Sequence, residues 1–421
     1  MDLVVNRPVK INGETQILSS KSELHRLILI SAFAKGNGTK IYYNGSLSED
    51  VLATIGCVKS IGAKVETDKN CITVYPTSGS CKKPQVFCKE SGSTLRFILP
   101  TFSAFGADFS VTVSGRLGER PLSPMYEILV ERGVIASENG KYPLNVSGKF
   151  TGGDITVSGN VSSQFISGML MALPLTGKSG SITVTGEFQS KPYVDITVDA
   201  MRKFGVDVKI DGNVYRVPQS QYRSFGEVKA GGDWSNTAFF ASMGALGGKM
   251  KITGLALDSM QGDKTVVEAL KKFGAKVDFS GDVLTVEKSE LKGVELDCGD
   301  IPDLVPCLAV VASVAKGKTL FYNASRLKIK ESDRIKSTVE MINALGGKAT
   351  ATDDGIEIEG VSTLTGGTVN GYNDHRIVMS SAVASCVSNN AVKILGAQAV
   401  NKSFPNFFEI IKGMGFEIIG E

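Results

Sequence analysis

Positively charged side chains recur beside the expected helix starts and in the loops that follow them. Four stand near a helix start: Lys21, Arg26, Arg96 and Arg376. Five stand in the loops that open a second set of helices: Arg120, Lys191, Lys330, Arg334 and Lys402. The first N–H groups of a helix lack intrahelical partners and carry partial positive charge, so helix starts attract anions. Taken singly each cation is typical of a solvated surface, but their recurrence predicts a site for phosphate-bearing anions.

Hydroxyl groups accompany these cations. They belong to Ser22, Ser162, Ser163 and Ser190. A hydroxyl is a neutral donor that suits a phosphate oxygen. Ser162 and Ser163 are equally compatible with ordinary capping of the helix that follows them.

Carboxylates are fewer in the same loops, at Asp303, Glu331, Asp333 and Asp374. A carboxylate surrounded by cations stays ionised and can accept a proton from a substrate hydroxyl. Two structural interpretations remain open. Asp303 can cap a helix after Pro302, and Glu331 can form an ion pair with Arg334 three residues further on.

A unit of about 70 residues, repeated six times, must position these groups. Each copy closes at a glycine that fits a left-handed helix cap. These glycines are Gly62, Gly133, Gly205, Gly274, Gly346 and Gly415. Roughly 40 residues upstream of each lies a helix-start signal. The six signals begin at Ser20, Glu90, Ser162, Asp233, Asp300 and Asn373.

Each copy reads as helix, strand, helix and strand, with short strands at the joins. This pattern predicts an α/β protein, and 421 residues are too many for one ordinary core. We therefore expect two domains of three units, with a boundary near 227–233. Because residues 1–19 precede the first copy, they are expected to pair with the last one.

Composition and motifs exclude several classes of protein. A net charge of +3 without a basic stripe argues against nucleic-acid binding. Seven cysteines without a Cys-x-x-Cys pair indicate reduced thiols and a cytoplasmic protein, and two histidines argue against a histidine-rich metal site. We find neither a signal peptide nor an apolar stretch of membrane-spanning length. The usual motifs for nucleotide hydrolysis, dinucleotide binding and zinc proteolysis are absent.

Seven short motifs, in order, carry a resemblance along essentially the whole chain. They are Ser20-Lys21-Ser22 with Arg26, Glu119-Arg120-Pro121, Ser162-Ser163-Gln164-Phe165, Ser190-Lys191-Pro192-Tyr193, Lys330-Glu331-Ser332-Asp333-Arg334, Asn373-Asp374-His375-Arg376 and Lys402-Ser403-Phe404-Pro405. Together they resemble the 3-phosphoshikimate 1-carboxyvinyltransferase (EPSP synthase) family of enolpyruvyl transferases. Each motif is weak alone, and their order makes the resemblance specific.

The resemblance implies transfer of the enolpyruvyl group of phosphoenolpyruvate to the 5-hydroxyl of shikimate 3-phosphate, with release of phosphate. It implies the route to aromatic amino acids, a tetrahedral intermediate and no metal or organic cofactor. The implied fold has two domains, each of three βαβαββ-type units around a pseudo-threefold axis, an inside-out α/β barrel. The domains are expected at 20–229 and at 1–19 plus 230–421, with the active site in the interdomain cleft of a monomer.

By the same resemblance, Asp303 is the candidate base, Glu331 the candidate for proton transfer, and Lys21 assists. The shikimate 3-phosphate site is implied at Lys21, Ser22, Arg26, Ser162, Ser163, Gln164, Ser190, Tyr193, Asp303 and Lys330. The phosphoenolpyruvate site is implied at Lys21, Gly92, Arg120, Gln164, Arg334, Arg376 and Lys402.

The sequence departs from the commoner family pattern in two places. Residues 90–93 read Glu-Ser-Gly-Ser where many members have Asn-Ala-Gly-Thr, and Arg326 stands where an Asn often contacts the shikimate ring. Two alternatives remain. UDP-N-acetylglucosamine enolpyruvyl transferases share the donor but carry a cysteine that 113–121 lacks. A non-catalytic anion-binding scaffold would explain the cations but not Asp303 and Glu331.

Overall fold

The computed structural model describes residues 1–79 and 83–420, so Cys81 lies outside the described residues. Contacts between Cα atoms divide the chain into two compact units. The N-terminal unit comprises residues 19–45 and 49–231, and the C-terminal unit comprises 1–18, 46–48 and 232–421. No helix in the described ranges has the length and apolar character needed to cross a membrane.

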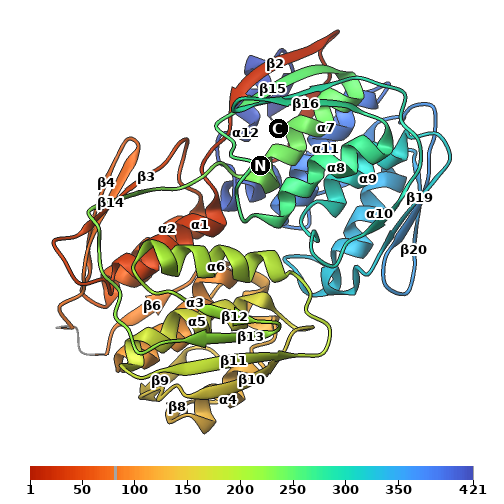
Figure 1. Ribbon diagram of the computed structural model, residues 1–421. Helices are drawn as coiled ribbons and strands as arrows, with labels where there is room; N and C mark the ends of the chain where they lie inside the picture. Colours follow the sequence, from red (N-terminus) through yellow and green to blue (C-terminus); the bar gives the residue numbers. More distant parts are fainter. Residues whose placement is uncertain (80–82, 421) are drawn as a thin grey trace. The chain divides into compact units, whose positions relative to one another are not determined.

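Three four-stranded sheets form in the N-terminal unit (Figure 1). The first, in spatial order, is β14 (Glu227–Lys229), β3 (Thr39–Tyr42), β5 (Cys71–Tyr75) and β4 (Lys64–Asp68). The second is β6 (Gln85–Phe87), β7 (Phe109–Thr112), β9 (Leu144–Gly148) and β8 (Val134–Ala136). The third is β10 (Asp154–Ser158), β11 (Gly180–Thr185), β13 (Val214–Val217) and β12 (Lys209–Asp211). In each sheet the first pair of strands is parallel and the other two pairs are antiparallel.

The C-terminal unit repeats this pattern. Its first sheet, in spatial order, is β2 (Ile11–Gln16), β15 (Gly248–Thr253), β17 (Val283–Glu287) and β16 (Lys276–Ser280). The second is β18 (Glu295–Asp297), β19 (Lys318–Tyr322), β21 (Ile356–Glu359) and β20 (Lys348–Ala351). The third is β22 (Gly367–Asn370), β23 (Val392–Leu395), β1 (Leu3–Asn6) and β24 (Glu417–Gly420). Strand β1 takes the third place in the last sheet, where it is antiparallel to both β23 and β24. The start of the chain therefore completes the final repeat, while β2 lies parallel to β15 in the fourth.

The first helix of each repeat is buried. These helices are α1 (Lys21–Ser31), α3 (Gly92–Phe105) and α5 (Ser163–Ala172) in one unit, and α7 (Trp234–Gly247), α9 (Val305–Ser313) and α11 (His375–Ala384) in the other. All residues of α9 and α11 are buried, and α9 is apolar on nearly every side, as expected for a core helix. Helix α3 packs so closely on α5 that a Cβ at Gly168 would lie 2.3 Å from the Arg96 carbonyl oxygen. Buried helices with paired strands around them confirm the predicted inside-out α/β class.

The second helices end as the sequence predicts. They are α2 (Glu49–Ser60), α4 (Met125–Glu131), α6 (Lys191–Lys203), α8 (Val266–Phe273), α10 (Arg334–Ala344) and α12 (Phe407–Gly413). All six marker glycines follow them with positive φ, between 80° and 97°. This left-handed conformation is accessible to glycine at little steric cost, so the repeat signal had a local physical cause.

The cap interpretation left open for Asp303 is wrong. Helix α9 begins at Val305, with Leu304 in the N-cap position and no side-chain cap. Asp303 therefore does not cap this helix, and its carboxylate is used elsewhere.

Candidate active site

The other five first helices begin with a side-chain cap. Their N-cap residues are Ser20, Ser91, Ser162, Asp233 and Asp374. Each accepts a hydrogen bond from a backbone N–H of the first turn. The other N–H groups at the same helix end have no acceptor within the helix. The capping interpretation is thus confirmed for Ser162, which accepts from the N–H of Gln164 at 3.3 Å, whereas Ser163 is the first residue of α5.

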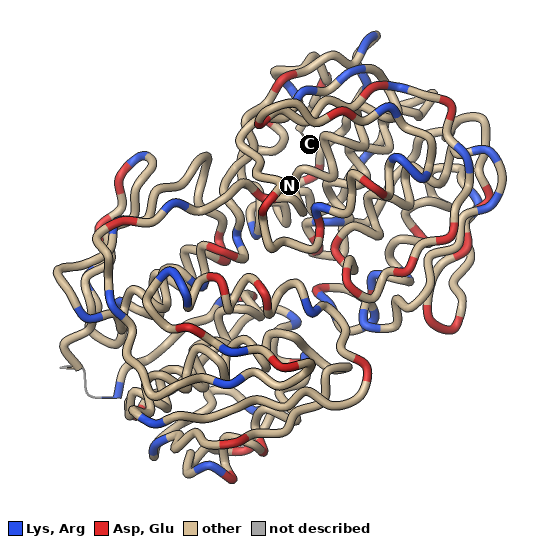
Figure 2. The backbone as a smooth tube through the Cα atoms, viewed as in Figure 1, with Lys and Arg blue, Asp and Glu red and all other residues tan. Residues whose placement is uncertain are grey.

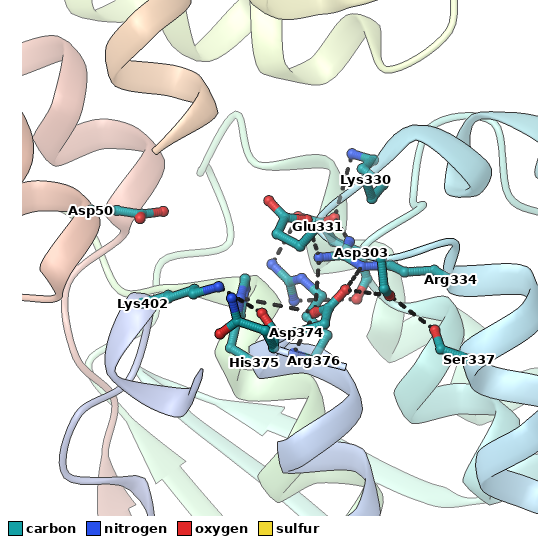
Figure 3. Close-up of polar contacts among 12 residues, drawn as sticks. Asp50, Asp303, Lys330, Glu331, Arg334, Ser337, Asp374, His375, Arg376 and Lys402 are labelled. Carbon is teal, nitrogen blue, oxygen red and sulfur yellow. Dashed lines mark hydrogen bonds and ion pairs between the residues drawn. The ribbon is translucent and has the colours of Figure 1, made fainter. Parts of the chain in front are cut away.

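Asp303 lies at the centre of a cationic cluster in the C-terminal unit (Figure 3). Its Oδ1 accepts from Arg334 Nη1 at 2.7 Å and lies 3.6 Å from Lys330 Nζ. Its Oδ2 accepts from Arg376 Nη2 at 2.8 Å. Cations from the starts of α10 and α11 therefore converge on one carboxylate, which itself lies just before α9.

Arg334 connects this carboxylate to two others. Its Nη2 donates to Glu331 Oε2 at 2.6 Å, and its Nε donates to Asp374 Oδ2 at 2.8 Å. Ser332 also donates to Asp374, at 3.0 Å. The ion pair between Glu331 and Arg334 was one of the two interpretations open for Glu331, and it is confirmed. Arg334 itself is buried, with a side-chain exposure of 1%.

The cluster sets the protonation of its members. Burial alone would raise the pKa of Asp303, but Arg376, Lys330 and Arg334 together hold that pKa well below its usual range. Burial lowers the pKa of Lys330 to about 8, against the opposing attraction of Asp303. Asp303 is thus an ionised carboxylate, and Lys330 is a cation that titrates close to neutral pH.

Lys402 lies beside this cluster, and Arg376 makes a second contact within it. Lys402 Nζ donates to the carbonyl oxygen of Asn373 at 2.6 Å, in the turn that precedes α11. Arg376 Nη1 also donates to the Asp303 carbonyl oxygen at 3.2 Å. The structure therefore gathers Asp303, Lys330 and the predicted phosphoenolpyruvate residues of this unit around the helix starts.

The N-terminal unit brings a second group together around Gly92. A Cβ at Gly92 would lie 2.8 Å from Arg96 Nη1 and 2.9 Å from Arg120 Nη1, so both guanidinium groups approach its backbone closely. Arg96 Nη1 donates to Gln164 Oε1 at 2.8 Å, and Gln164 Nε2 donates to Ser93 Oγ at 2.9 Å. Two guanidinium groups therefore lie beside the start of α3, and both guanidinium groups and helix starts are groups that attract anions.

Lys21 and Arg26 lie on α1. Lys21 Nζ forms an ion pair with Asp50 Oδ2 at 2.8 Å. Arg26 is 2% exposed, and burial lowers its pKa to about 9. Its guanidinium donates to Thr197 Oγ1 at 2.6 Å and to the carbonyl oxygens of Ser22 and Tyr193 at 2.6 and 2.8 Å. Arg26 thus joins α1 to α6.

Ser190 stands at the N-terminus of α6 and is buried, with a positive φ of 57°. A non-glycine residue rarely adopts this conformation, so the neighbouring structure must hold it there. Ser22, Ser190 and Tyr193 are therefore all placed near the α1 and α6 starts. The predicted acceptor residues that lie on α5, Ser163 and Gln164, belong to the same repeat as Ser190 and Tyr193.

Two carboxylates absent from the predicted catalytic set join these groups. Asp50 pairs with Lys21. Asp263 accepts a hydrogen bond from Ser235, and burial together with the nearby Asp303 raises its pKa to about 6. Both stand in loops or first turns that open second helices, the same repeat position as Lys330 and Glu331. Comparing the six copies position by position would have found them.

Comparisons with known proteins decide the family. The profile of the family described as EPSP synthase (3-phosphoshikimate 1-carboxyvinyltransferase) matches residues 5–411. This chain belongs to the EPSP synthase family. A 3-phosphoshikimate 1-carboxyvinyltransferase of Clostridium kluyveri is 40% identical over 99% of this chain and 98% of its own. One from Methanocorpusculum labreanum is 36% identical over 99% of both chains.

Solved structures agree with this membership. An EPSP synthase from Acinetobacter baumannii superposes with a TM-score of 0.82 at 26% identity, over 100% of both chains. The enolpyruvyl transferase NikO from Streptomyces tendae has a TM-score of 0.78 at 15% identity, over 99% of this chain and 98% of its own, which shows a shared fold. The EPSP synthase fold thus extends over the whole chain.

Proposed function

We propose that this protein transfers the enolpyruvyl group of phosphoenolpyruvate to the 5-hydroxyl of shikimate 3-phosphate and releases phosphate. The observation that carries the proposal is the Asp303 carboxylate, held ionised among Arg334, Arg376 and Lys330. Binding of two anionic substrates explains the cations. A carboxylate placed among them has no use in anion binding alone, because it repels the ligands.

The residues divide between the two substrates. We assign Lys21, Gly92, Arg120, Gln164, Arg334, Arg376 and Lys402 to phosphoenolpyruvate. We assign Lys21, Ser22, Arg26, Ser162, Ser163, Gln164, Ser190, Tyr193, Asp303 and Lys330 to shikimate 3-phosphate. Support comes from the convergence of Gly92, Arg96, Arg120 and Gln164 in one unit, and from the Asp303 cluster in the other.

The proposed reaction is an addition followed by an elimination. Asp303 accepts the proton of the 5-hydroxyl while the hydroxyl oxygen bonds to C2 of phosphoenolpyruvate. Glu331, assisted by Lys21, delivers a proton to the methylene carbon of phosphoenolpyruvate. Loss of a proton from the resulting methyl group and departure of phosphate then restore the double bond. The surrounding cations stabilise the charge of the tetrahedral intermediate.

Donor binding adjusts the basicity of Asp303 in this scheme. Without substrate, two guanidinium groups and Lys330 hold its pKa low, which makes it a weak base. The carboxylate and phosphate of phosphoenolpyruvate compete for Arg334 and Arg376. When these guanidinium groups turn to the donor, the Asp303 carboxylate loses stabilisation and becomes a stronger base.

The test is phosphate release by the purified protein from phosphoenolpyruvate, with shikimate 3-phosphate as acceptor and UDP-N-acetylglucosamine as control. Release that requires shikimate 3-phosphate supports the proposal. Release with only the UDP-sugar moves the assignment to the related transferase. If phosphoenolpyruvate binds but no phosphate is released with either acceptor, the result favours the anion-binding scaffold.

One chain carries every residue assigned above, so we propose that it acts as a monomer. We place it in the cytoplasm, a reducing compartment, because the six cysteines among the described residues are free thiols.

A further inference from the structure

A continuous row of buried hydrogen bonds links three helices of the N-terminal unit. His25 Nδ1 lies 2.7 Å from Thr54 Oγ1, and Thr54 Oγ1 lies 2.7 Å from Thr94 Oγ1. Thr94 Oγ1 donates to Ser91 Oγ, also at 2.7 Å. None of the four residues is more than 2% exposed. We call His25, Thr54, Thr94 and Ser91 the buried relay.

Each end of the relay lies close to a residue assigned to the substrates. His25 follows Lys21 by four residues on α1, and Thr54 follows Asp50 by four on α2. Residues four apart occupy the same face of a helix. Ser91 caps α3 and directly precedes Gly92. The relay therefore joins α1 and α2, one helical turn after Lys21 and its ion-pair partner Asp50, to the first turn of α3, which carries Gly92.

Counting protons gives the relay a direction. Ser91 Oγ accepts from both the N–H and the hydroxyl of Thr94, at 3.3 and 2.7 Å, which uses both of its lone pairs. The single proton of the Thr94 hydroxyl goes to Ser91 Oγ at 2.7 Å, with the Asp50 carbonyl oxygen as a longer second acceptor at 3.4 Å, so Thr54 must donate to Thr94. Nδ1 of His25 must then donate to Thr54.

The surroundings of His25 agree with this direction. Burial, reinforced by Lys21 and Arg26, lowers the pKa of His25 well below its usual value, so the ring is neutral. A neutral ring with its proton on Nδ1 has an acceptor at Nε2. Nε2 is buried without a hydrogen-bond partner among the described residues. An unpaired acceptor there is tolerated better than an unpaired N–H donor would be.

We propose that the buried relay positions Lys21 and Gly92 for phosphoenolpyruvate by locking the second turns of α1 and α2 to the first turn of α3. This inference rests on the proposed function for the identity of the ligand. The relay residues act through Lys21, Asp50 and Gly92 and do not touch substrate. Ser91 lies within residues 90–93, where this sequence departs from the commoner family pattern, and Thr94 directly follows them.

The kinetic test compares Thr54→Val with a matched control. Thr54→Val keeps the side-chain shape and removes both hydrogen bonds in the middle of the relay. We expect the KM for phosphoenolpyruvate to rise about tenfold, from the loss of buried hydrogen bonds, with kcat and the KM for shikimate 3-phosphate within about threefold. Thr54→Ser restores the hydroxyl and should restore the KM.

The control is Thr101→Val on α3. Thr101 is 1% exposed and donates to the Phe97 carbonyl oxygen at 2.7 Å, outside the relay. It should lose a similar amount of stability without a change in the KM for phosphoenolpyruvate. Equal KM values in the two valine variants, or a Thr54→Ser variant no better than Thr54→Val, would overturn the proposal.

A spectroscopic test needs no turnover. The chain has two histidines, so the ¹⁵N spectrum of the imidazole nitrogens is simple, and His25→Gln assigns the signals by removing one set. We expect Nδ1 of His25 to be the protonated nitrogen between pH 6 and 8, and we expect this preference to weaken in Thr54→Val. A proton on Nε2 in the unmodified protein contradicts the relay. If the relay is seen but phosphate release fails, the proposed function fails separately.

Discussion

At the scale of single residues, the chemistry depends on which charges are paired before substrate arrives. Arg334 touches Asp303, Glu331 and Asp374 at once, and Arg376 touches Asp303. These contacts hold the pKa of Asp303 well below its usual range and keep the guanidinium groups in place. They also mean that anionic substrates bind by exchanging partners with existing ion pairs, which preserves charge balance in a buried site.

Asp303→Asn removes the proposed base while keeping its shape. We expect kcat to fall by about 10²–10⁴-fold, the range for loss of a general base. The affinities for both substrates should change little, because Arg334 and Arg376 are left with one anionic competitor fewer. Steady-state kinetics and titration calorimetry measure both quantities. Asp282→Asn, in the exposed turn between β16 and β17, is the control; turnover of Asp303→Asn equal to that of this control excludes Asp303 from the mechanism.

Lys330 makes binding of shikimate 3-phosphate sensitive to pH. Burial lowers its pKa to about 8 from an ordinary 10.5, so it loses its charge in the folded protein as the pH rises through 8. We expect the Kd for shikimate 3-phosphate to rise about tenfold per pH unit above that point. In Lys330→Arg the guanidinium stays protonated, so the rise should be absent. A Kd that is flat to pH 10 in the unmodified protein would show that Lys330 does not bind the phosphate.

The same shift has a defined sign for stability. The folded-state pKa of Lys330 lies below its unfolded value, so the unfolded chain binds more protons between about pH 8 and 10.5. The cost of burying this charge is fully present below pH 8. This cost disappears as the pH rises from about 8 to 10.5. The contribution of Lys330 alone therefore makes the free energy of unfolding larger at pH 10.5 than at pH 8.

At the scale of elements, the six glycine caps show why the repeat could be predicted. A left-handed helix cap depends on a few adjacent residues, so Gly62, Gly205 and their counterparts carry a local signal. The start of α9 lacked such a signal. Pro302 and Asp303 resemble a cap, but the carboxylate faces Arg334 and Arg376, which come from helices far along the chain. Tertiary ion pairs outweighed the local preference there.

The same contrast applies to the candidate site. The cations at helix starts and the pair of Glu331 with Arg334 follow from spacing within a few residues. The burial of Arg26 and the pairing of Lys21 with Asp50 depend on how α1 packs on α6 and α2, which no short motif records. Asp263 shares the repeat position of Lys330 and Glu331, which makes it a candidate, and its neighbourhood with Asp303 and Ser235 then distinguishes it.

Gly205→Ala tests the cap at the end of α6. Gly205 has φ +80°, and an added Cβ would meet only Phe225, at 3.5 Å, so strain in the backbone is the main cost. We expect a loss of about 1–2 kcal/mol in the free energy of unfolding. Gly56→Ala, inside α2 with nothing within 4 Å, should instead gain about 0.5–1 kcal/mol. Urea unfolding measures both, and equal effects of the same sign would contradict the assigned role of the cap.

At the scale of the whole molecule, positive and negative side chains are interspersed in both units (Figure 2), and the net charge is only +3. The cations that matter are concentrated by the repeat, since each copy adds a helix start and a loop at an equivalent place. Repeated three times in each compact unit, an α/β unit that brings one or two charged side chains to its helix end supplies the cations that the proposed binding of two multiply charged substrates requires.

Chelation tests the claim that side chains alone supply this charge. Among the described residues, no group of three or more His, Cys, Asp or Glu side chains is arranged to hold a metal ion. We expect phosphate release in about 5 mM EDTA, an excess over any bound divalent metal ion, to match phosphate release by the untreated protein. Inactivation by EDTA that added Mg²⁺ or Zn²⁺ reverses would require a metal in the reaction.

The central claim is transfer by cleavage of the C–O bond of phosphoenolpyruvate, and isotope position tests it most directly. Phosphoenolpyruvate labelled with ¹⁸O in the oxygen that bridges C2 and phosphorus is incubated with the protein and shikimate 3-phosphate. The masses of the products are then measured by mass spectrometry. Our account predicts all of the label in the released phosphate and an unlabelled enolpyruvyl group on the acceptor. Label retained in pyruvate, with unlabelled phosphate, would show cleavage of the P–O bond and contradict the account.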